Sequence, residues 1–184
     1  MAMMLDESEA SDAELIGRAK DGDRGAFGKL LERHYDFVYR AAYRWCGKKA
    51  DAEDVAQEVC IRLGRAIRDY HGSGAFTTWL YTMTLNAARD VMRKTARETV
   101  KTDAYGAYAL ISGEAEPEDP TEALWAAVRM LPGKQRDAVL LVYGEGLSHA
   151  AAAEAMGISE TTVSWHIHEA KKRLQTLVRS TGEV

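Results

Sequence analysis

The sequence lacks the features that define several classes of protein. None of its 184 residues belong to an apolar run of 18, so no transmembrane helix is expected. The N-terminal stretch MAMMLDESEASDAEL is acidic and has no basic start followed by an apolar segment, which argues against a secretory signal. Both absences predict a cytoplasmic protein without membrane insertion.

Metal-binding and disulfide patterns are also absent. The only two cysteines, Cys46 and Cys60, form no ligand pattern, and a disulfide between them is not expected in a reducing cytoplasm. Two partly buried thiols are the simpler interpretation, and a redox role is the alternative. His166 and His168 would point about 200° apart on a helix, so they cannot chelate one ion together. No metal or other cofactor is predicted.

Strand signals are nearly absent too, because no apolar and polar alternation is sustained and no Asn-Gly or Asp-Gly turn occurs. Apolar residues instead recur at helical spacing over about 26–46, 51–70 and 75–95, and again in shorter segments after residue 120. The fold class predicted is all-α, with two small helical domains. The expected helix caps and stops are Ser11 with Glu14, Gly47, Ser148, Gly157 and Ser159.

The net charge of −4 is unevenly distributed along the chain. Residues 23–94 carry 13 basic and 9 acidic side chains, whereas residues 95–120 carry 2 and 6 and lose the helical periodicity. A flexible acidic linker is expected there. The predicted organisation is an acidic N-terminal segment with a short helix (1–22), a first domain (23–96), the linker (97–120) and a second domain (121–184).

The second domain contains the pattern of a helix-turn-helix. LSHAAAAEAMGISETTVSWHIHEAKKRL reads as a short alanine-rich helix, a turn with glycine, and a second helix that would enter the major groove of DNA. An ordinary helical hairpin is the alternative. Val163, Ile167, Ala170 and Leu174 would be buried, which leaves for the exposed face Thr161, Thr162, Ser164, Trp165, His166 and His168, with Lys171, Lys172 and Arg173 for phosphates.

Two helices of the first domain have distinctive outer faces. The helix expected over 51–70 presents Asp54, Gln57, Glu58 and Ile61 opposite its apolar stripe, and no nucleophile or phosphate loop accompanies these acids. A solvated acidic face is the simpler interpretation, and no catalytic residue is predicted. The next helix combines Trp79 with asparagine and arginine, which suits stacking on unpaired bases, although Trp79 as a core residue is the alternative.

Both halves resemble one family. DAEDVAQEVCIRLGRAIRDY followed by AFTTWLYTMTLNAARDVMRK resembles the second conserved domain of bacterial extracytoplasmic-function (ECF) sigma factors, and LPGKQRDAVLLVYGEGLSHAAAAEAMGISETTVSWHIHEAKKRL resembles their fourth domain. The resemblance implies a non-enzymatic alternative sigma factor. Its implied partners are core RNA polymerase (β′ clamp helices and β flap), promoter DNA and a cognate anti-sigma factor.

The resemblance also suggests which residues meet which partner. The residues expected to bind core polymerase are Asp51, Glu53, Asp54, Gln57, Glu58 and Ile61. Those expected at the −10 element are Phe76, Trp79, Asn86, Arg89, Asp90, Arg93 and Lys94. Those expected at the −35 element are Ser159, Thr161, Thr162, Ser164, Trp165, His166, His168, Lys171, Lys172 and Arg173.

The last helix departs from the family pattern. TTVSWHIHEAK stands where GTVKSRLHRAR is common, so Ser164, Trp165, His166 and Glu169 replace small or basic residues. The −35 sequence read by relatives therefore cannot be transferred to this chain. Two alternatives remain open, namely a LuxR-type helix-turn-helix regulator and a sigma-like mimic that titrates an anti-sigma factor.

Overall fold

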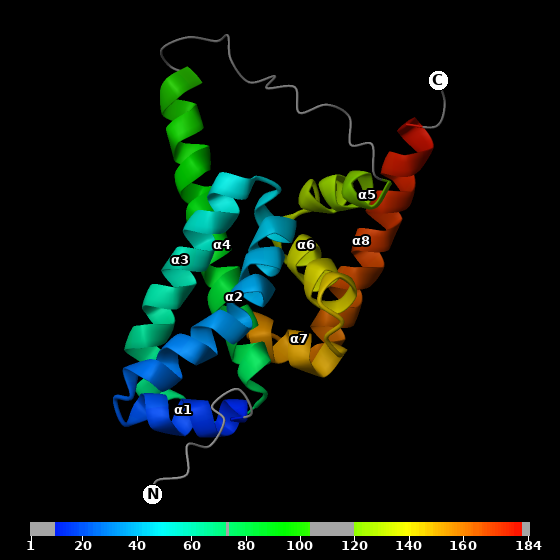
Figure 1. The fold of residues 1–184 in the computed structure, drawn as a ribbon. Helices are drawn as coiled ribbons and strands as arrows, with labels where there is room; N and C mark the ends of the chain where they lie inside the picture. Colours follow the sequence, from blue (N-terminus) through cyan, green and yellow to red (C-terminus); the bar gives the residue numbers. More distant parts are fainter. Residues whose placement is uncertain (1–9, 73, 104–119, 182–184) are drawn as a thin grey trace, which may run out of the picture.

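A computed structural model of the chain describes residues 10–72, 74–103 and 120–181 (Figure 1). These residues form helices joined by turns and contain no strand, which confirms the all-α prediction. None of the helices within those ranges is long and apolar enough to cross a membrane. In chain order they are α1 (Asp12–Lys20), α2 (Arg24–Cys46), α3 (Lys49–Ala66), the 3₁₀ turn η1 (Ile67–Asp69), α4 (Phe76–Asp103), α5 (Pro120–Arg129), α6 (Gly133–Val139), the π-helical turn η2 (Leu140–Gly144), α7 (His149–Met156) and α8 (Glu160–Thr181).

The helix ends form where the sequence signals predict them. Ser11 and Glu14 make a capping box at the start of α1, in which the Ser11 hydroxyl accepts from the Glu14 N–H and the Glu14 carboxylate accepts from the Ser11 N–H. The Ser148 hydroxyl caps α7 in the same position. Gly47 and Gly157 end α2 and α7 with φ of 74° and 63°, a left-handed conformation that glycine adopts without strain.

Helices α1 to α4 form the N-terminal domain. Helices α2, α3 and α4 pack along one another, and α1 crosses one end of the bundle (Figure 1). The apolar spacing of the sequence explains this packing, because the side chains three and four residues apart line one face of each helix. The fully buried larger side chains of this domain include Leu15, Leu30, Trp45, Val55, Leu63, Leu80 and Leu85.

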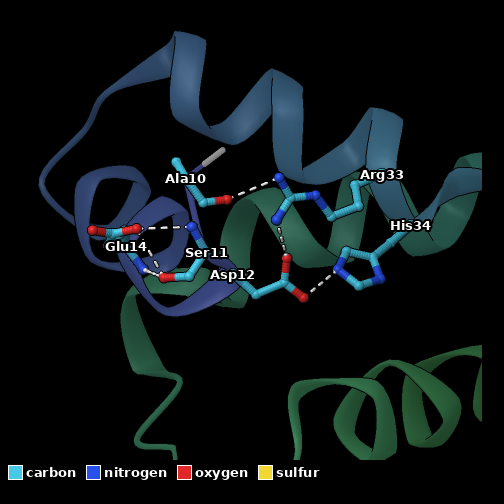
Figure 2. Close-up of polar contacts among 6 residues, drawn as sticks. All are labelled: Ala10, Ser11, Asp12, Glu14, Arg33 and His34. Carbon is cyan, nitrogen blue, oxygen red and sulfur yellow. Dashed lines mark hydrogen bonds and ion pairs between the residues drawn. The ribbon is translucent and has the colours of Figure 1, made fainter. Parts of the chain in front are cut away.

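A cluster of polar contacts fastens α1 to α2 (Figure 2). The Asp12 carboxylate accepts from Arg33 Nη1 at 2.7 Å and lies 2.7 Å from His34 Nε2, and Arg33 also donates to the Ala10 carbonyl. Burial alone would raise the pKa of Asp12, but these hydrogen bonds and the charges of Arg33 and His34 outweigh it and lower that pKa. Helix α1 is therefore anchored to the bundle.

Helices α5 to α8 form the C-terminal domain. Three of the four residues of the expected stripe of α8 are buried, with Val163 at 0%, Ile167 at 4% and Ala170 at 0% exposure, and Leu174 is partly buried. Helix α7 packs against α8, and its small side chains allow the close approach that the alanine run predicts. The helix-turn-helix arrangement of α7 and α8 is therefore present.

Two features differ from the sequence-based expectation. Helix α4 continues to Asp103, so residues 97–103, expected in the linker, are helical, while 104–119 lie outside the described residues. The two domains were also expected to be joined only by a tether, yet α2 and α4 pack directly against α5, η2 and α7 (Figure 1). Their buried residues belong to one continuous cluster.

Candidate polymerase and nucleic-acid interfaces

The outer side of α3 forms an acidic groove beside α4. Its cavity of about 430 Å³ is lined by Asp51, Asp54, Gln57, Glu58 and Ile61 from α3, so the structure brings together five of the six residues predicted to bind polymerase. Glu53 is exposed but does not line the groove. Ile61 is 50% exposed among these polar groups, and α4 supplies the opposite wall. We name these five residues and their groove the α3 face.

Arg62 connects the α3 face to α4. Its Nε donates to Glu58 Oε1 at 2.7 Å, and its Nη2 donates to Asp90 Oδ2 at 3.0 Å. The other oxygen of Asp90 accepts from Arg93. Hydrogen bonds from Arg62 and Arg93 lower the pKa of Asp90, so this carboxylate stays ionised. The sequence did not single out Arg62, because its partners come from two helices.

An aromatic cluster lies at the start of α4. The Trp79 ring is 4.8 Å from the Tyr70 ring and 5.9 Å from the Phe76 ring, measured between centroids. Phe76 is only 7% exposed. It therefore packs against Trp79 inside the domain and does not face outward, as a residue that contacts bases would. Trp79 and Tyr70 line a pocket of about 270 Å³ with His71 and Thr82. We name this the Trp79 pocket.

The middle of α4 carries the other residues predicted for the −10 element. Asn86, Arg89, Asp90 and Arg93 line one open groove of about 650 Å³, and Arg136 of α6 closes its far side. Lys94 does not line this groove and instead lines the neighbouring groove of the α3 face. Arginine side chains beside an amide could contact a nucleic-acid backbone and its bases. Arg89, however, is already paired with a carboxylate from the other domain.

Helix α8 presents most of the residues predicted for the −35 element. Trp165 is 55% exposed, and the basic side chains Lys171, Lys172 and Arg173 in the middle of the helix are exposed as well. Thr162 is half-buried, and its N–H donates to the Ser159 hydroxyl, which caps the helix as predicted. The Ser164 hydroxyl forms a hydrogen bond with Nδ1 of His149 in α7. The exposed residues of the predicted set are Ser159, Thr161, Ser164, Trp165, His168, Lys171, Lys172 and Arg173.

His166 was expected on the exposed side of α8, and the structure contradicts that position. It is 8% exposed, and burial followed by the charge of Lys134 lowers its pKa, against the opposing charge of Asp137. The spacing explains why, since His166 follows Val163 by three residues and precedes Ala170 by four. That signal was available in the sequence.

Several residues at these surfaces were not anticipated from the sequence. Tyr70 ends the segment of apolar periodicity expected over 51–70, but its ring forms part of the Trp79 pocket. Two carboxylates of the C-terminal domain approach α4, because the buried Asp137 accepts from Arg89 and Glu154 lines the Trp79 pocket. Among the described residues, no group of three His, Cys, Asp or Glu side chains is arranged to hold a metal ion.

Comparison with known proteins agrees with this arrangement. Sigma-70 region 2 matches residues 30–98, and sigma-70 region 4 matches residues 121–174. The chain is 31% identical to the ECF RNA polymerase sigma factor SigM of Mycobacterium tuberculosis over 170 residues, which cover 92% of the chain and 86% of SigM. It is 34% identical over 176 residues to SigE of Mycolicibacterium smegmatis, covering 84% of the chain but only 63% of SigE.

A solved structure is similar over nearly the whole chain. CnrH, in complex with the cytosolic domain of CnrY, aligns with a TM-score of 0.68 and 25% identity, covering 92% of this chain and 97% of CnrH. The two sigma-70 regions occur in the family order, and SigM is similar over most of its length. The chain therefore belongs to the ECF family of RNA polymerase sigma factors.

Proposed function

We propose that this chain is an alternative sigma factor that binds core RNA polymerase through the α3 face and directs promoter-specific initiation through α4 and α8. The observation that carries the proposal is the position of Ile61. This large apolar side chain is 50% exposed in an acidic groove whose opposite wall carries Asp90 and Lys94, two residues predicted for the −10 element. One helix pair therefore presents a protein-docking surface beside a nucleic-acid surface.

The α3 face has the chemistry of a protein interface. Protein interfaces commonly combine an apolar centre that excludes water with a polar rim, and in the α3 face Ile61 would supply the centre and the surrounding charged groups the rim. Asp54 and Glu58 suit a partner surface that carries basic side chains. The clamp helices of the polymerase β′ subunit are the partner that the family resemblance implies.

The two nucleic-acid surfaces suit different forms of DNA. The Trp79 pocket offers aromatic rings on which unpaired bases can stack, with Arg93 and Lys94 further along α4 for phosphates. Helix α8 suits the major groove of duplex DNA, with Trp165 and Thr161 exposed near its start. We assign the first surface to the −10 element and the second to the −35 element, with the C-terminal domain also contacting the β flap.

The free protein should bind DNA weakly. Its net charge is −4, so few phosphates are neutralised and little counterion is released. Binding to polymerase would hold both domains near their promoter elements, where weak contacts suffice. The polymerase then catalyses RNA synthesis, and the chain itself is not an enzyme. As a partner of the polymerase, it would act in the cytoplasm. CnrH was solved in complex with the cytosolic domain of CnrY, which supports a bound protein partner for this chain, and the family resemblance implies that this partner is an anti-sigma factor.

Reconstituted transcription tests the proposal. Core polymerase from the organism that encodes the chain is combined with fragmented genomic DNA, and transcript starts are mapped with and without the chain. We expect discrete new start sites that share one upstream motif. Asp54→Lys and Ile61→Asp should each weaken core binding by about tenfold or more, because interface centres carry most of the affinity.

A matched control separates docking from general charge effects. Asp36→Lys makes the same charge reversal at an exposed position of α2, and it should leave core binding unchanged. A chain that binds core polymerase but yields no new start site would instead be a titrating mimic. The LuxR-type alternative is not favoured, since the N-terminal half matches sigma-70 region 2.

A further inference from the structure

Helix α1 has no part in the surfaces assigned so far. It precedes residues 30–98, which match sigma-70 region 2, and none of the residues expected to contact polymerase or DNA lies in it. It is nevertheless a well-defined element, with a capping box at its start and apolar side chains buried against the bundle. Two of its polar residues, Asp12 near the start and Lys20 at the end, reach toward the Trp79 pocket by separate routes.

The Lys20 end contacts the wall of the pocket directly. Lys20 Nζ donates to the Tyr70 carbonyl oxygen at 2.8 Å, across 50 positions of the sequence. The Tyr70 hydroxyl in turn donates to the Gly74 carbonyl oxygen at 2.8 Å. Both the backbone and the hydroxyl of Tyr70 are therefore held in place. These contacts fix the ring that lies 4.8 Å from the Trp79 ring between centroids.

The Asp12 end acts through α2 (Figure 2). A carboxylate only accepts hydrogen bonds, so the His34 Nε2 that lies 2.7 Å from Asp12 must carry the hydrogen. This bond orients a ring that is only 9% exposed. The His34 ring meets the Phe76 ring with centroids 5.2 Å apart and planes at 68°, which is a favourable edge-to-face arrangement. Asp12 therefore sets the direction in which His34 supports Phe76.

Phe76 joins the two routes. Its ring centroid lies 5.5 Å from that of Tyr70 and 5.9 Å from that of Trp79. A groove of about 480 Å³ separates α1 from the turn after η1, and both Asp12 and Lys20 line it together with Tyr70 and Phe76. Rings packed at these distances cannot move independently. A displacement of Tyr70 or Phe76 is therefore passed to Trp79.

We infer that Asp12 and Lys20 are positioning residues for the −10 element, and that α1 holds the Trp79 pocket in the geometry on which an unpaired base stacks. The inference rests on the proposed function, because it concerns the same pocket. A ring that moves freely must be ordered when a base binds, and this ordering weakens binding. Contacts that fix the ring beforehand therefore raise the affinity for the unpaired strand.

Both contacts can be removed without opening the hydrophobic core. The side chain of Asp12 is 33% exposed, and Lys20 is half-buried at the end of its helix. Neither belongs to the buried apolar cluster of the domain. Their loss should loosen the pocket while the helices stay folded, which circular dichroism and the melting temperature check.

The first experiment measures the geometry of the pocket in the free full-length chain. Lys20→Met keeps the aliphatic stem and removes the donor to Tyr70, whereas Arg24→Met removes a positive charge from an exposed position of α2. The indole N–H signals are recorded by NMR on isotope-labelled tryptophan, and Trp79→Phe identifies the Trp79 signal. Lys20→Met should shift or broaden that signal, and Arg24→Met should leave it unchanged. Lys20→Arg keeps a donor and should restore most of the wild-type spectrum.

The second experiment measures binding of the −10 strand by the chain in complex with core polymerase. The probe is a single-stranded oligonucleotide that carries the −10 motif shared by the mapped start sites. Its affinity should fall about threefold to tenfold for Lys20→Met, with core affinity unchanged. Asp12→Asn should also weaken binding, because an amide has one acceptor oxygen where the carboxylate has two. Asp36→Asn makes the same change at an exposed position of α2 and should have no effect.

A double-mutant cycle separates positioning from a general effect on the fold. In a Trp79→Ala background the pocket is already lost, so Lys20→Met should weaken strand binding no further. Equal losses in both backgrounds, or an unchanged Trp79 signal in Lys20→Met, would overturn the role of α1. If the wild-type complex yields no start site or binds no −10 strand, the proposed function fails instead, and the NMR comparison still decides whether α1 holds the pocket.

Discussion

Trp165 and His166 are adjacent on α8 with ring centroids 4.9 Å apart, yet Trp165 is 55% exposed and His166 only 8%. Successive side chains of a helix point about 100° apart, so neighbours can lie on opposite sides of the boundary between core and surface. The two residues that most distinguish this helix from the family pattern therefore have different roles. Trp165 is available to DNA, and His166 supports the fold.

Trp165→Ala should change promoter selectivity without changing stability. The indole is exposed near the start of the helix that we assign to the major groove, so its removal deletes a contact with base edges or sugars. Mapped start sites should shift in relative use by about tenfold, with the −35 positions most affected. Core binding and the melting temperature should stay at wild-type values. Unchanged start-site use would show that Trp165 does not contribute to promoter recognition.

The sequence predicted local structure better than long-range contacts. Caps such as Ser11 and stops such as Gly47 depend on neighbouring residues, so they could be located from spacing alone. The burial of His166 could also have been predicted from spacing. Histidine is polar, however, and for that reason it was expected on the exposed face. Trp45 and Asp137 are 92 residues apart and show no shared pattern, so only the folded chain reveals their contact.

Trp45→Phe should destabilise the chain strongly. The substitution removes the indole donor of a buried hydrogen bond to the Asp137 side chain and leaves space where a side chain of 0% exposure stood. These two losses together cost about 2–4 kcal/mol. Thermal denaturation should show a midpoint lower by about 5–10 °C. Trp165→Phe, at an exposed site, is the control and should change the midpoint little.

Arg62 should act as a positioning residue for the −10 surface. Arg62→Met removes the link between Glu58 and Asp90, so the Asp90 and Arg93 side chains lose a fixed geometry while remaining present. Exposed ion pairs contribute about 1 kcal/mol or less, so the fold should survive. Strand opening, measured by permanganate reactivity of −10 thymines, should fall about threefold or more, with a smaller change in core affinity.

The controls for Arg62 separate position from charge. Arg65→Met removes a positive charge from the same helix at an exposed position and should leave strand opening unchanged. Arg62→Lys keeps the charge but cannot hold two carboxylates with one planar group, so it should rescue only in part. Full activity of Arg62→Met would show that the link has no function.

The buried imidazole of His166 should make stability depend on pH. Burial and the charge of Lys134 lower its pKa below the ordinary 6.5, while Asp137 opposes them, so the folded protein disfavours the protonated ring. The unfolded chain binds the proton first as pH falls, and stability is therefore complete above pH 6.5 and declines as pH falls toward the folded pKa. Its Nδ1 atom is buried without a hydrogen-bond partner among the described residues, which is consistent with a neutral ring.

Melting temperatures measured between pH 7.5 and 5.5 test this dependence. The wild-type chain should lose stability across that interval, and His166→Gln should lose less, because a neutral amide has no proton to gain. Other titrating groups are common to both proteins and cancel in the comparison. His168→Gln removes an exposed imidazole two residues away and should keep the wild-type slope. Equal slopes for His166→Gln and the wild type would mean that the imidazole titrates freely in the folded protein.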